Sequence, residues 1–128
     1  MPTVLLEFPS RSAYVGVARL AVAGVARAAG FDEDSVFDIK TAVSEALSNA
    51  VLHGDETGED TSMTVSWEDG PDSVIIEVRH PGDLDPLPGG GPDEQQALSM
   101  ALLRSLVDET EFVSGEDGST TIRLTLRH

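Results

Sequence analysis

Four polar residues recur at every fourth position near the middle of the chain, and two of them have side chains suited to chemistry. They are Thr41, Glu45, Asn49 and His53. Residues four apart are neighbours on a helix surface, and such a row drifts by about 40° per step. The carboxylate of Glu45 could accept a proton from a hydroxyl or a water. The amide oxygen of Asn49 is a neutral ligand for Mg²⁺, which also keeps waters and substrate phosphates. On spacing alone, an ordinary solvated helix surface is the more common interpretation.

The residues between these four have the spacing of a helix that buries one face. Apolar residues recur at steps of three and four, namely Val36, Ile39, Val43, Ala46, Leu47 and Ala50. Ser35 with Asp38 three positions later resembles a capping box, and Gly54 is a typical residue to follow a helix end. The sequence therefore predicts a helix over about residues 35–53.

The other elements follow from apolar periodicity and from turn residues. Alternating residues predict strands at 3–8, 109–114 and 120–127 and a hairpin at 62–79, while an Ala-rich segment at 12–28 predicts a helix that stops at Gly30. Residues 80–92 are expected to form a loop because they are rich in Pro and Gly. A third helix is expected after Asp93, and its predicted core face consists of Leu98, Ala101, Leu102, Ser105 and Leu106.

This order of elements predicts a single domain over residues 1–128. Helices that follow strands in this way pack on one face of a sheet. The expected fold class is an α+β two-layer sandwich, with a mostly antiparallel five-stranded sheet and three helices on one face.

The composition excludes several classes of function. The chain has 23 acidic and 8 basic residues and a formal net charge of −15. This charge disfavours binding to nucleic acids and to anionic membrane surfaces. The charge suits a basic protein partner, although solubility alone would also explain it. Without cysteine there is no disulfide or thiolate metal site, and the three histidines lack zinc-site spacing. No secretory signal or membrane span is seen, so a cytoplasmic location is expected.

The segment Ala-Val-Ser-Glu-Ala-Leu-Ser-Asn-Ala-Val-Leu-His-Gly at residues 42–54 resembles the N-box of the GHKL ATP-binding superfamily. It is closest to the anti-sigma-factor serine kinases and related bacterial regulators, and residues 103–109 resemble the segment that leaves the last helix of that family. The resemblance implies a GHKL (Bergerat-like) fold over nearly the whole chain. It also implies that Glu45 is the general base towards a partner's serine. Asn49 would hold Mg²⁺ against the phosphates of ATP, with His53 beside the nucleotide.

Two glycine motifs of the family are altered in this chain. His80 stands where the family has an Asp that binds the adenine amine, and a neutral imidazole lacks the charge and second oxygen of a carboxylate. Gly82 matches the first glycine of that motif, and Asp85 or Asp83 could replace the missing acid. In the second motif, Ala97 and Ser99 replace glycines, and a Cβ at these positions hinders close approach of phosphates to the backbone. Gly89, Gly90 and Gly91 lie just upstream and could supply a phosphate cradle or be a remnant of a lid.

The resemblance implies an anti-sigma regulatory factor that sequesters an alternative sigma factor. A STAS-type anti-anti-sigma partner would release it, with ATP and Mg²⁺ as cofactors if kinase activity on that partner is retained. One alternative is an Mg·ATP-dependent protein serine kinase as the main role, and another is a GHKL remnant that binds a different small ligand. A stress response is the expected setting. A homodimer is also expected, through Ala18, Ala21 and Val22 of the first helix, although these could equally belong to the core.

Overall fold

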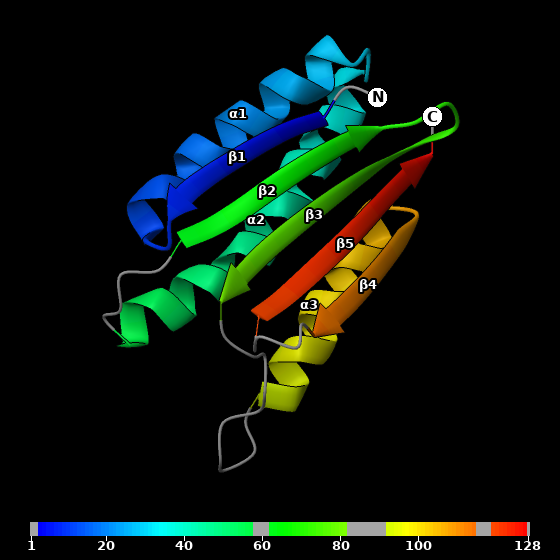
Figure 1. Ribbon diagram of the computed structural model, residues 1–128. Helices are drawn as coiled ribbons and strands as arrows, with labels where there is room; N and C mark the ends of the chain where they lie inside the picture. Colours follow the sequence, from blue (N-terminus) through cyan, green and yellow to red (C-terminus); the bar gives the residue numbers. More distant parts are fainter. Residues whose placement is uncertain (1–2, 58–61, 82–91, 115–118, 128) are drawn as a thin grey trace.

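The structure is a computed structural model that describes residues 3–57, 62–81, 92–114 and 119–127 (Figure 1). The elements in chain order are β1 (Thr3–Pro9), a 3-10 turn (Ser12–Tyr14), α1 (Val15–Ala28), α2 (Glu33–Thr57), β2 (Ser62–Asp69), β3 (Ser73–Pro81), α3 (Pro92–Leu106), β4 (Glu109–Ser114) and β5 (Ser119–Arg127). The strands form one sheet in the order β1-β2-β3-β5-β4, and every neighbouring pair is antiparallel. Figure 1 shows the helices on one face of this sheet, which confirms the predicted fold class.

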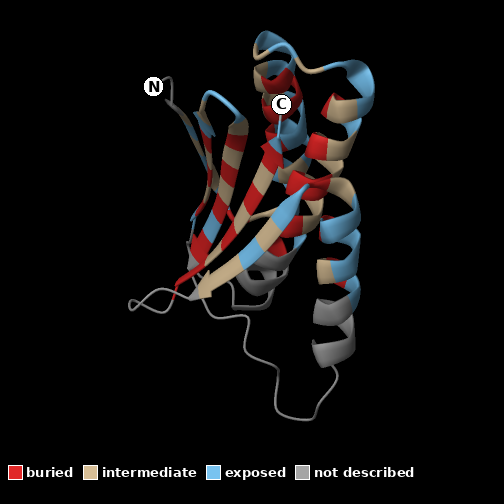
Figure 2. Ribbon diagram, turned by 90° about the vertical axis from the view of Figure 1, so that its right-hand side faces the viewer, coloured by how far each residue is buried: buried red, intermediate tan, exposed pale blue. Residues whose placement is uncertain are grey.

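The core lies between the sheet and the helices. Alternate residues of the central strands point to the helices, and the register places Val65 opposite Val78 and Val78 opposite Ile122 in one buried row. Figure 2 shows the resulting alternation of buried and more exposed positions along these strands. Each fully buried side chain of this size contributes about 1.5–3 kcal/mol relative to an exposed one. Ala18 and Val22 of α1 are part of this core and cannot contact a second subunit, whereas Ala21 is half-buried.

The predicted stop of the first helix at Gly30 is confirmed. Gly30 has a φ of 95°, a left-handed conformation that glycine adopts without steric cost. Its N–H donates to the carbonyl of Arg27 at 3.0 Å, and the next N–H, that of Phe31, donates to the carbonyl of Ala26 at 3.1 Å. The chain then enters α2, where Arg27 and Glu33 form an exposed salt bridge at 3.0 Å between α1 and α2.

Helix α2 extends beyond both predicted ends. Asp32 is its N-cap, because the Ser35 backbone N–H donates to Asp32 Oδ1 at 2.8 Å, and this bond lowers the pKa of Asp32. The predicted capping box at Ser35 and Asp38 was therefore wrong by three residues. Gly54 was also wrong as a helix end, since α2 continues to Thr57. Glycine inside a helix costs only about 1 kcal/mol, which neighbouring contacts can offset.

The predicted face of α3 was wrong except at Leu106, which is partly buried against the core. Leu98 is 71% exposed and Leu102 is 40% exposed, whereas Leu103 is fully buried. The connection to β4 sets the rotation of the helix. The Val107 N–H donates to the carbonyl of Leu103, and the Asp108 N–H donates to that of Thr125 on β5, so the chain joins the sheet at once. Val107 must enter the core there, and the residue four positions earlier points the same way.

The predicted loop at residues 80–92 begins later than expected. Strand β3 runs to Pro81, and His80 is a strand residue that lies opposite Thr120 of β5. Proline occupies the first position of α3, where its missing N–H would have no helical partner in any case. Residues 82–91, which include Gly82, Asp83, Asp85 and the three consecutive glycines, lie outside the described residues.

Candidate functional site

The sequence places the candidate site where α2, β3 and α3 come together at one end of the molecule. The C-terminal half of α2, the end of β3 and the N-terminal half of α3 all lie at this end (Figure 1). The glycine-containing motifs predicted from the sequence flank the same region, since one follows β3 and the other belongs to α3. The fold therefore brings three separate parts of the chain to one place.

Glu45 lies on the flank of α2 that faces α3. Asp38, two turns earlier on the same helix, lines a pocket together with the last turn of α3. Seven residues are close to two full turns, so Glu45 continues this flank. Glu45 is half-buried, and among the described residues its carboxylate has no hydrogen bond or ion pair. A carboxylate in this position has acceptor capacity for a proton or a donor group.

Asn49 and His53 lie on α2 beyond Glu45, towards the C-terminal end of the helix. Asn49 lies one turn beyond Glu45, on the same helical row, so the predicted acid and amide share one flank of a continuous helix. The side chains of Asn49 and His53 lie outside what the structure describes. The chemistry of the pair fits a magnesium phosphate, because one amide oxygen can complete a shell made mostly of water and phosphate oxygens. No group of three or more metal-binding side chains is found in the described part of the chain.

His80 is buried at the end of β3. Its side chain is 1% exposed, and the neighbouring Ser119 and Thr120 on β5 are also buried. His80 and Thr120 are directly opposite each other in the sheet, on the face that is turned to the core. The imidazole therefore faces the protein interior. A carboxylate that binds the adenine amine would have to be accessible to the nucleotide. His80 therefore differs in charge and in number of acceptor atoms from the Asp that the family has at this position.

Ser99 of α3 is the polar residue whose role the sequence left open. It is 8% exposed, and its Oγ has no hydrogen-bond partner among the described residues. A buried hydroxyl without a partner costs about 1–3 kcal/mol. Sequence reasoning treated Ser99 only as a replaced glycine. The signal that was available is its position four residues before the buried Leu103, which places it on the inner face.

The described helices include none that is long and apolar enough to cross a membrane.

An antiparallel sheet covered on one face, with an acid and an amide one turn apart on the central helix, is the arrangement of the GHKL class of α+β sandwiches. A model of the histidine kinase-like ATPase domain matches residues 8–126, and the chain belongs to this family.

Several known proteins resemble this chain over most of its length. The serine-protein kinase RsbW of Halalkalibacterium halodurans is 29% identical, over 96% of this chain and 82% of that protein. The anti-sigma F factor of Clostridium beijerinckii is 32% identical, over 91% of this chain and 87% of that protein. The crystal structure of the RsbU and RsbW domains of Rv1364c from Mycobacterium tuberculosis superposes with a TM-score of 0.76 at 24% identity. That match covers 99% of this chain and 32% of the other chain, and it supports the fold alone.

Proposed function

We propose that this protein is a cytoplasmic anti-sigma regulatory factor, in which the one domain sequesters an alternative sigma factor. Binding of a STAS-type anti-anti-sigma partner then releases this protein from the sigma factor. The observation that carries the proposal is the similarity of nearly the whole chain to proteins named RsbW and anti-sigma F factor. The net charge of −15 supports it, because a promoter-binding partner has basic surfaces and opposite charge steers such partners together.

Nucleotide chemistry takes second place in this proposal because only half of the predicted site fits it. The acid and amide on α2 have the right chemistry for the phosphate end. At the adenine end His80 is buried, and at the phosphate end Ser99 fills a position where the family has glycine. When bound, Mg·ATP would supply the phosphoryl group. Glu45 would accept the proton of the partner's serine hydroxyl, Asn49 would hold the metal ion, and His53, Gly82 and Asp85 would line the nucleotide.

A homodimer belongs to the same proposal. The buried Ala18 and Val22 cannot form its contact, so the exposed side of α1 is the relevant surface. Val17 and Leu20 lie there with exposed apolar side chains, three residues apart on one stripe. Leu20→Glu is expected to convert a dimer to a monomer in sedimentation experiments. Arg19→Glu serves as the control, because it also places a carboxylate on the exposed surface of α1.

The anti-sigma role is tested by mixing the purified protein with each sigma factor of the source cell. We expect one sigma factor to co-elute on a sizing column and to lose activity in transcription with purified RNA polymerase. Addition of the STAS partner should restore that activity. Failure of every sigma factor and every STAS protein to bind would overturn the proposal.

The kinase alternative is tested by calorimetry with Mg·ATP and by a phosphoryl-transfer assay. Asn49→Ala should remove any heat of binding, and Glu45→Gln should lower transfer by at least about 100-fold without weakening nucleotide binding. Thr41→Ala, one turn away on the same row, is the matched control. No heat at millimolar nucleotide would indicate that the protein binds its partners without nucleotide, and transfer unaffected by Glu45→Gln would remove that residue from the mechanism.

A further inference from the structure

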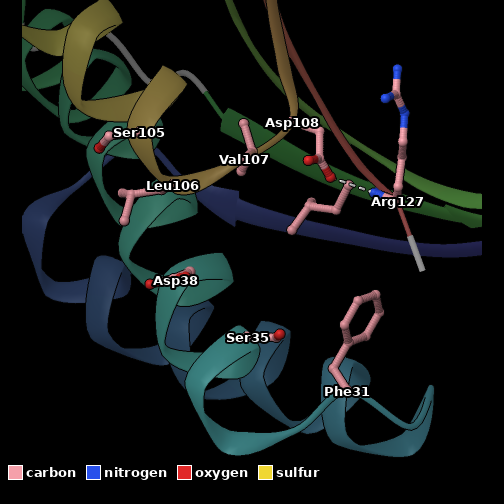
Figure 3. Close-up of a pocket in the computed structure, with 9 residues that line it drawn as sticks. Phe31, Ser35, Asp38, Ser105, Leu106, Val107, Asp108 and Arg127 are labelled. Carbon is pink, nitrogen blue, oxygen red and sulfur yellow. Dashed lines mark hydrogen bonds between the residues drawn. The ribbon is translucent and has the colours of Figure 1, made fainter.

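A pocket of about 220 Å³ (Figure 3) lies at the other end of the molecule from the candidate nucleotide site (Figure 1). It is formed where α2 begins and where α3 and β5 end. Its volume is below the about 300–1,000 Å³ of clefts that enclose drug-sized ligands. The pocket is therefore of a size to receive one long side chain.

The apolar part of this pocket is its floor, and most of the exposed surface around it is polar. It includes Phe31, Val107 and Leu126, and the latter two are buried. Phe31 is held by an edge contact with Trp67 of the core, with 6.0 Å between the ring centroids. A floor of this kind favours the aliphatic stem of a long side chain, because burial of methylene groups is favourable.

The rim of the pocket carries two carboxylates with unused acceptor capacity. Asp38 has no hydrogen bond or ion pair within the described residues, since Asp32 caps the helix in its place. Asp108 accepts the Arg127 backbone N–H on Oδ2 at 2.6 Å, and this bond orients the carboxylate. In the described part of the chain its Oδ1 has no partner. Each carboxylate could accept a charge-assisted hydrogen bond from a cationic donor, and such bonds are stronger than those between neutral groups.

The cationic side chain nearest to the pocket does not neutralise these acids. The guanidinium of Arg127 points away from Asp38 in Figure 3, and its Nη2 lies 3.4 Å from Glu109 Oε1. Ser105 and Leu106 of the last turn of α3 also line the pocket. The carbonyl end of a helix favours a cation, so the helix adds to the attraction of the two carboxylates.

We propose that this pocket receives a single arginine side chain from a protein partner. The stem lies on the floor beside Phe31, and the guanidinium donates to Asp38 and Asp108. Arginine fits better than lysine, because its five N–H donors can serve two carboxylates at once and its planar head packs on apolar and aromatic surfaces. The inference goes beyond the proposed function, since it needs no nucleotide and does not depend on the partner being a sigma factor.

The test is an NMR titration of the ¹⁵N-labelled full chain with N-acetyl-arginine amide. We expect saturable shifts, at millimolar concentration, of the amides of Ser35, Ser105 and Val107. The citrulline analogue, which has the same shape without the charge, should leave these amides unshifted. Equal shifts with both probes would overturn the proposal, and so would shifts spread evenly over the acidic surface.

Two variants separate the pocket from general charge attraction. Asp38→Asn should weaken binding of the probe at least fivefold, whereas Asp34→Asn, which removes the same charge from an exposed position one turn earlier on α2, should change it less than twofold. Asp108→Asn should also weaken binding fivefold, and its amide oxygen can still accept the Arg127 N–H. Equal effects of Asp38→Asn and Asp34→Asn would reject the site. Tighter binding of free arginine than of the capped amide, by tenfold or more, would replace the protein partner with a small molecule.

Discussion

The two helices on either side of the candidate site, α2 and α3, are held to the sheet in different ways. α2 presents a continuous buried face that runs from Val36 to Val51. α3 buries Ser99 and Leu103 among its described residues and leaves Leu98 and Leu102 exposed. The helix that carries Glu45 and Asn49 is therefore packed against the core along most of its length. The described part of α3 is attached to the sheet at its C-terminal end, where Val107 and Asp108 follow the helix.

The largest expected effect tests the attachment of α3. Leu103→Ala should destabilise the protein by about 2–5 kcal/mol, because it removes a fully buried leucine and leaves a cavity. Leu98→Ala is the matched control on the exposed side, and it should change stability by less than about 0.5 kcal/mol. Urea unfolding monitored by circular dichroism measures both. A greater loss with Leu98→Ala would show that α3 buries the other face.

The same difference between α2 and α3 explains why the buried face of one helix, and not of the other, could be predicted from the sequence. The face of α2 was predictable, because apolar residues occupy one side and polar residues the other. α3 has leucines on two sides, at Leu98 and Leu102 and again at Leu103, so periodicity could not choose between them. The choice was made by the long-range bond from the Asp108 N–H to the carbonyl of Thr125, which no local pattern reveals.

The candidate site shows the same limit. The spacing of Glu45 and Asn49 on one flank of α2 follows from helix geometry alone. The burial of His80 depends on its place opposite Thr120 in the sheet, which requires knowledge of the strand order. The N-terminus of α2 was misplaced because Ser35 followed by Asp38 has the pattern of a capping box. The bond from the Ser35 N–H selects Asp32.

A smaller effect of opposite sign is expected at Ser99. Ser99→Ala should stabilise the protein by about 1 kcal/mol, because it removes a buried hydroxyl that has no partner in the described structure and keeps the Cβ. Ser105→Ala is the control on the same helix, since the Ser105 hydroxyl is exposed and already donates to the Leu102 carbonyl. Thermal unfolding measures both. A loss of stability on Ser99→Ala would mean that the hydroxyl has a partner beyond the described residues.

The start of α2 should respond to both mutation and pH. Asp32→Ala should lower Tm by about 4 °C at pH 7, because it removes the acceptor for the Ser35 N–H. That hydrogen bond holds the pKa of Asp32 below its usual value. The stabilisation is therefore complete above the pKa of the unfolded state and is lost as pH falls through the lower folded pKa. The difference in Tm between the two proteins should shrink below about pH 4, and a constant difference would assign the effect to something other than the carboxylate.

The smallest effect is expected at the Arg27–Glu33 pair, which joins α1 to the first turn of α2. The Nε–Oε2 distance is 3.0 Å, and the interaction raises the pKa of Arg27 and lowers that of Glu33. Both side chains are largely exposed, so solvent and salt weaken the attraction. Arg27→Gln should change Tm by about 1 °C or less in 0.15 M salt, and the change should vanish in 1 M salt, where the screening length is about 3 Å. A loss of several degrees that persists in high salt would mean that α2 depends on α1 for its position, and that its own buried face and cap do not suffice.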